Sequence, residues 1–74
     1  MFKTELNCEE ENILIQMLDG EAKKRNDILL EINYCNKNTE EPEFKNILKN
    51  LFNKIKDTSD YEFDEYIRLL LEKN

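Results

Sequence analysis

The chain has 74 residues, with 17 acidic and 11 basic side chains and a formal net charge of −6 at pH 7. This length indicates a single helical domain over residues 1–74, near the smallest size at which a chain buries enough apolar surface to fold alone. The excess of negative charge argues against a direct nucleic-acid partner, and no apolar run approaches the roughly 20 residues of a membrane span.

The first predicted helix begins after Asn7, a residue type favoured at the N-cap position. Three consecutive acids, Glu9, Glu10 and Glu11, follow in the first turn, where the helix dipole favours negative charge. The apolar residues beyond them are spaced as on one face of a helix: Ile13, Leu14, Met17 and Leu18. This pattern predicts a helix that starts at about residue 8.

Gly20 leaves two interpretations of the next segment open. It either ends a first helix, with a second helix from Glu21 to about Asn36, or lies inside one long helix at a cost of about 1 kcal/mol relative to alanine. Six residues keep helical phase across the glycine: Leu14, Leu18, Ala22, Arg25, Leu29 and Ile32. We therefore favour a continuous helix over residues 8–35, with a break at Gly20 as the alternative.

A β-strand is a competing interpretation of residues 28–35. Apolar and aromatic side chains occupy every second position from 28 to 34, and residues 1–6 offer a partner strand for a small α+β fold. Leu29 interrupts the alternation and strong helix formers surround the segment, so we favour the helix.

The clearest helical pattern covers residues 42–57. Pro42 suits the first helical position, and Lys54 and Lys56 suit the last turn. Six large apolar residues recur at steps of three and four: Phe44, Ile47, Leu48, Leu51, Phe52 and Ile55. Other helices must cover such a stripe, which we expect to be the centre of the core.

The last predicted helix covers residues 60–73. Ser59 and Glu62 fit a capping box at its start. Its apolar face comprises Phe63, Tyr66, Ile67 and Leu70. The sequence therefore predicts an all-α fold, a small bundle of three helices at about 8–35, 42–57 and 60–73, or of four helices if the first is broken at Gly20.

Few residues suit catalysis or cofactor binding. The chain has no histidine, and its single glycine excludes the phosphate-binding loops of nucleotide enzymes. Cys8 and Cys35 match no metal or redox spacing, and two lone thiols favour a reducing cytoplasm. We therefore expect a cytoplasmic protein with no enzymatic activity, no cofactor and no metal.

Negative charge is concentrated in two clusters that open predicted helices, residues 9–11 and 60–65. One interpretation is that both clusters only complement helix dipoles. The other is that they form a surface resembling a row of phosphates, which binds and inhibits a basic nucleic-acid-binding protein as a DNA mimic. The partner-binding candidates are Glu9, Glu10, Glu11, Asp60, Glu62, Asp64 and Glu65.

Three apolar triplets, residues 13–15, 28–30 and 69–71, suggest a different function. Consecutive helical residues are about 100° apart, so a triplet cannot face one neighbour. Each triplet is either buried on two sides within the bundle or contributes apolar surface to a dimer or a partner. The alternative function is therefore a structural or assembly protein that oligomerises, for example as a homodimer.

The acidic start at residues 9–11, the following Ile13-Leu14-Ile15 and Met17-Leu18, and residues 29–33 resemble the small acidic helical anti-repressors of Firmicutes and their phages, in particular the antagonist of the AbrB transition-state regulator. The resemblance covers about residues 6–33. It implies a helical protein whose acidic surface imitates DNA, with contacts at Glu9, Glu10 and Glu11. Phage inhibitors of host defence nucleases, including anti-CRISPR proteins, share this size and acidity.

Overall fold

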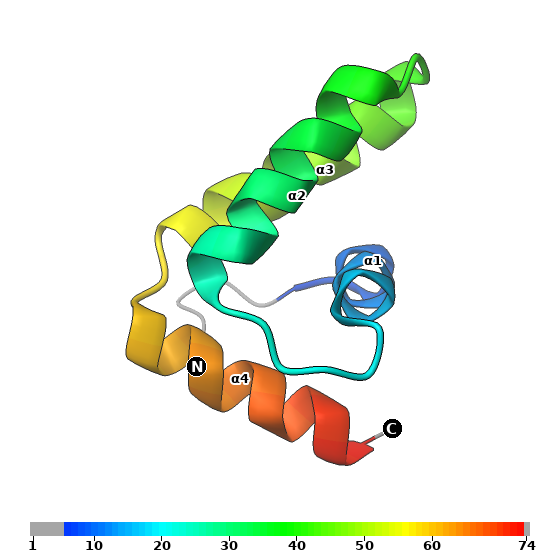
Figure 1. The fold of residues 1–74 in the computed structure, drawn as a ribbon. Coiled ribbons are helices and arrows are strands. Elements are labelled where there is room, and N and C mark those ends of the chain that lie inside the picture. The colour runs from blue at the N-terminus through cyan, green and yellow to red at the C-terminus, as the bar shows by residue number, and fades with distance from the viewer. Residues whose placement is uncertain (1–5, 74) are drawn as a thin grey trace.

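The computed structural model describes residues 6–73, which form four α-helices and no strand. They are α1 (Cys8–Leu18), α2 (Arg25–Asn38), α3 (Pro42–Lys56) and α4 (Asp60–Lys73). In Figure 1, α2 and α3 form an antiparallel pair, and α1 and α4 cover the same end of that pair. The all-α prediction is confirmed, and the strand interpretation of residues 28–35 is wrong because they lie within α2.

The favoured continuous helix over residues 8–35 is also wrong. The chain leaves the helix after Leu18, with Asp19 at φ 51° and Gly20 at φ 78°, both in the left-handed region. Glycine adopts this conformation without steric cost, and aspartate tolerates it better than most residues. The alternative with a break at Gly20 agrees with the structure, although α2 begins at Arg25 rather than at Glu21.

The helical phase across Gly20 was misleading because two of the four residues beyond the glycine do not pack in the core. Ala22 is exposed in the connection, and Arg25 forms an ion pair with α4. The buried residues of α2 are Ile28 and Ile32, of which only Ile32 belongs to the set that keeps phase. A shared 3.6-residue phase is thus compatible with two separate helices.

The predicted starts of α1, α3 and α4 agree with the structure. Asn7 and Glu10 form a capping box, with hydrogen bonds of 2.8 and 3.0 Å between each side chain and the other's backbone N–H. Pro42 opens α3. The Ser59 hydroxyl accepts a hydrogen bond from the Glu62 N–H at 3.1 Å and donates one to its carboxylate at 3.0 Å.

One hydrophobic core joins the four helices. Its buried side chains are Leu14, Leu18, Ile28, Ile32, Leu48, Leu51, Ile55, Phe63, Ile67 and Leu70. The predicted stripe of α3 lies at its centre, with three members fully buried and Phe44, Ile47 and Phe52 half-buried at its edges. Within residues 6–73, no helix is both long and apolar enough to cross a membrane.

Candidate interaction surfaces

Glu10, one of the predicted partner contacts, lies inside the fold. Its side chain is 1% exposed, and its Oε1 accepts hydrogen bonds from the Asn7 N–H at 3.0 Å and from Lys54 Nζ at 2.6 Å. A buried carboxylate is tolerated when it is paired and hydrogen-bonded in this way. Glu10 therefore attaches α1 to α3, and the expectation that it is a surface contact is wrong.

The two neighbouring glutamates remain at the surface, Glu9 exposed and Glu11 half-buried. Consecutive helical side chains diverge by about 100°, so an inward Glu10 directs its neighbours to either side. Of the three acids that were predicted to contact a partner, only Glu9 and Glu11 therefore remain accessible. The buried Glu10, which contacts α3, lies between them.

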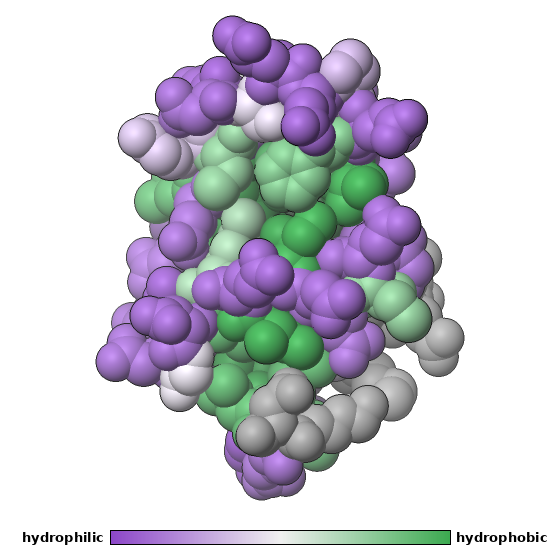
Figure 2. All heavy atoms as spheres, turned by 90° about the vertical axis from the view of Figure 1, so that its right-hand side faces the viewer, coloured by the Kyte–Doolittle hydropathy of each residue, from purple (hydrophilic) through white to green (hydrophobic). Residues whose placement is uncertain are grey.

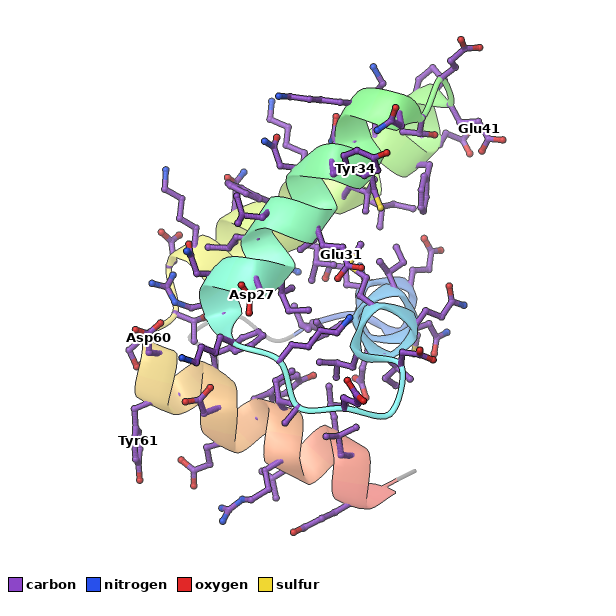
Figure 3. All side chains as sticks on the ribbon, viewed as in Figure 1. Asp27, Glu31, Tyr34, Glu41, Asp60 and Tyr61 are labelled. Carbon is purple, nitrogen blue, oxygen red and sulfur yellow. The ribbon has the colours of Figure 1, made fainter. Side chains whose placement is uncertain are left out.

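Asp60, in the second cluster, is neutralised locally. Its carboxylate lies 2.7 Å from Arg25 Nε, and the same guanidinium donates to the carbonyls of Ile55 and Lys56 at 3.5 and 3.3 Å. Figure 3 shows Asp60 at the start of α4, close to the first turn of α2. The Asp60 side chain is 79% exposed, so this pair contributes at most about 1 kcal/mol, but it joins α2, α3 and α4 at one point.

The remaining acids of the second cluster differ in their surroundings. Glu62 is half-buried and caps α4 through Ser59. Asp64 is exposed, and Glu65 lies 4.0 Å from Arg68 on the same helix. Asp64, Glu65 and Arg68 line a shallow depression of about 250 Å³ with Tyr61, which is 77% exposed. Of the four predicted contacts in the second cluster, only the carboxylates of Asp64 and Glu65 are thus accessible to a basic partner.

A second depression, of about 340 Å³, lies between the start of α1 and the α3–α4 connection. Its lining comes from the start of α1, the last turns of α3 and the α3–α4 connection: Asn7, Glu10, Asn50, Asn53, Lys54, Asp57 and Thr58. The first residue of α4, Asp60, follows Thr58 by two positions. Exposed Asp57 adds a carboxylate here that is not among the predicted partner contacts.

The apolar triplets are used mainly in the core, but two of them leave a leucine exposed. Leu30 is 63% exposed on α2 and Leu69 is 45% exposed on α4, while the other members of their triplets are buried or half-buried. Tyr34 and Tyr61 are also exposed, at 69% and 77%. Figure 2 shows further hydrophobic side chains reaching the surface above and below a hydrophilic band, on the face that carries α1. On α4 the predicted apolar face had already left out Tyr61 and Leu69.

Both cysteines are free, Cys8 exposed and Cys35 half-buried. Among residues 6–73 there is no group of three or more histidine, cysteine or acidic side chains that could hold a metal ion. The chain matches no protein-family model, no curated protein and no solved structure. A functional proposal therefore depends on the charge and geometry described above.

Proposed function

We propose that this protein is not an enzyme but binds and inhibits another protein, by covering a basic surface that otherwise holds nucleic acid. The observation that carries the proposal is the depression at the end of α3, which lies between the acidic start of α1 and the connection that leads into the acidic start of α4. The acids exposed or half-exposed on and beside these starts are Glu9, Glu11, Asp57, Asp64 and Glu65.

Electrostatics supports a basic partner. A polyanion-binding groove attracts a negatively charged protein at long range, and its lysines and arginines then pair with the acids that reach them. Two predicted contacts are not counted among these acids, because Glu10 is buried against Lys54 and Asp60 is paired with Arg25. The proposed acidic surface is therefore smaller than a continuous row of phosphates, and shape must contribute to its specificity.

The proposal places this chain functionally beside anti-repressors and phage inhibitors of host defence. Such proteins act stoichiometrically, so abundance and affinity decide inhibition. The complex should weaken steeply as salt increases, because exposed charge pairs are screened beyond about 10 Å at 0.1 M ionic strength.

The experiment compares two double charge reversals of equal net charge. Glu9→Lys with Glu11→Lys alters the proposed surface, and Glu40→Lys with Glu41→Lys alters the exposed α2–α3 connection at the far end of the pair (Figure 3). Each variant has a net charge of −6 + 4 = −2. The first variant removes two first-turn acids of α1, and the second removes the N-cap acid of α3 and the residue before it, so each places positive charge at a helix start.

Wild type and both variants are immobilised and used to capture a partner from a lysate of the host cell, at low and high salt and with added duplex DNA. We expect the first variant to lose the partner at least tenfold, the second to retain it, and DNA to displace the wild-type complex. Equal binding by the two variants, or a partner that DNA does not displace, would contradict the proposal.

A structural or assembly protein remains the second candidate. The exposure of Leu30 and Tyr34 supports it, since apolar side chains at the surface favour association. Association of this kind does not weaken as salt increases, which distinguishes it from a charge-led complex.

A further inference from the structure

The outward side of α2 carries an apolar pair surrounded by polar residues. Ile28 and Ile32 face the core, so the opposite side of the helix faces solvent. Leu30 and Tyr34 lie one turn apart on that side and are 63% and 69% exposed. The exposed polar residues around them are Asn26, Asp27, Asn33, Lys37 and Asn38.

These residues are arranged symmetrically about the level of Ile32. Leu30 and Tyr34 lie two positions to either side of it, and Asp27 and Lys37 lie five positions to either side. Suppose that two copies of α2 pack antiparallel about a two-fold axis that passes at the level of Ile32. A residue a given number of positions before Ile32 then lies beside the residue the same number of positions after Ile32 in the other copy. Leu30 then lies at the level of Tyr34 of the second copy, and Asp27 at the level of Lys37 of the second copy.

The two flanking charges are available for such a contact. Within residues 6–73, neither Asp27 nor Lys37 has an ion pair, whereas the nearby Arg25 pairs with Asp60 and Lys23 lies 3.6 Å from Glu31. The flexible Lys37 side chain can reach across the seam toward a carboxylate at the same level. An apolar centre with complementary charges at both ends is the arrangement expected of a self-complementary interface.

We propose that α2 is the surface on which a second copy of this chain docks, antiparallel and about a two-fold axis at the level of Ile32. The 14 residues of α2 span about 21 Å, so one helix pair buries less area than a standard stable interface. The dimer is therefore weak, with a dissociation constant on the order of tens of micromolar or above. This proposal is independent of the acidic surface, although a dimer would present that surface twice and gain avidity from it.

The first test is sedimentation of the full chain from about 10 µM to 1 mM, the range in which such a weak dimer forms. We expect wild type to shift from monomer to dimer, and Leu30→Glu and Tyr34→Asp to remain monomeric with unchanged helical content, since both positions are exposed. Tyr61→Asp, on the outer side of α4, is the matched control and should dimerise as wild type does. A wild-type chain that is monomeric throughout, or a Leu30→Glu chain that still dimerises, would overturn the proposal.

The second test fixes the geometry by charge exchange. Asp27→Lys alone and Lys37→Asp alone each place like charges at both ends of the dimer, so each should dimerise at least several-fold more weakly. A mixture of the two variants restores both opposite-charge contacts and should form heterodimers. A mixture of Glu40→Lys and Lys45→Glu has the same two net charges, −4 and −8, with the changes outside α2. In the first mixture heterodimers should exceed their statistical share because both homodimers are weakened, whereas the second mixture, with α2 unchanged, should give the statistical share. No excess of heterodimers in the first mixture, or the same excess in the second, would refute the antiparallel contact.

Discussion

At the scale of single residues, Glu10 shows how helix geometry separates acids that look equivalent in sequence. Glu9, Glu10 and Glu11 are consecutive, yet only Glu10 is buried, where it caps α1 and pairs with Lys54. Its capping role follows from a local spacing of three residues. Its ion pair joins positions 44 apart, which no local pattern reveals.

Glu10→Gln should isolate the contribution of the charge. Glutamine keeps an oxygen that can accept from the Asn7 N–H, but removes the negative charge that faces Lys54, whose side chain is only 24% exposed. We expect the free energy of unfolding to fall by about 1–2 kcal/mol, the range for a hydrogen bond to a charged group. Urea denaturation measures it, and Glu9→Gln, at an exposed position, should change it by less than about 0.5 kcal/mol. Equal values for the two variants would show that the ion pair adds nothing.

At the scale of elements, the helix boundaries predicted from the sequence are most accurate where capping or turn residues indicate both ends of the helix. The prediction of 60–73 matches α4, and that of 42–57 differs from α3 by one residue, because Pro42, Ser59 and the apolar period all act over a few positions. The break after α1 was only the alternative interpretation, because Gly20 interrupts no apolar period and no other residue near it clearly indicates a turn. Its left-handed neighbour, Asp19, is tolerated in that conformation but does not demand it.

Gly20→Ala tests the conformation of this connection. A β-carbon at Gly20 would meet no atom within 4 Å, so the cost comes from the backbone at φ 78° and not from a clash. That cost is about 1–2 kcal/mol, partly offset by the lower entropy of the unfolded chain, so we expect a net loss of about 1 kcal/mol in unfolding free energy. A more stable variant would instead favour the continuous helix over residues 8–35.

At the scale of the whole molecule, the four helices share one core, and the charged residues are unevenly distributed along the chain. All 17 acidic residues lie outside residues 44–56, a stretch that contains four lysines. Of these, Lys45, Lys49 and Lys56 are exposed, while Lys54 pairs with Glu10. An oriented charge distribution of this kind steers a charged partner toward one side. The candidate surface was only partly predictable, because tertiary contacts decide which acids remain free to meet a partner.

Leu51→Asp should unfold the entire domain. Leu51 is fully buried in the core shared by the four helices, and a carboxylate there would have no partner. The cost of several kcal/mol approaches the total stability expected of a domain this small. Circular dichroism should show loss of helix throughout, whereas Lys49→Asp, at an exposed position of α3, should keep a cooperative transition. A folded Leu51→Asp protein would mean that α3 does not form the centre of the core.

The pairing of Glu10 with Lys54 also bears on the order in which the chain assembles. α2 and α3 are joined by residues 39–41 alone, so their pairing closes a very short loop. Attaching α1 to the end of α3 closes a loop of more than forty residues, and the entropy lost grows with loop length. We therefore expect folding to begin with the α2–α3 hairpin and α1 to dock onto it afterwards. By the same reasoning in reverse, we expect α1, with its exposed acids, to be the segment that opens first in the native state, which hydrogen exchange would measure.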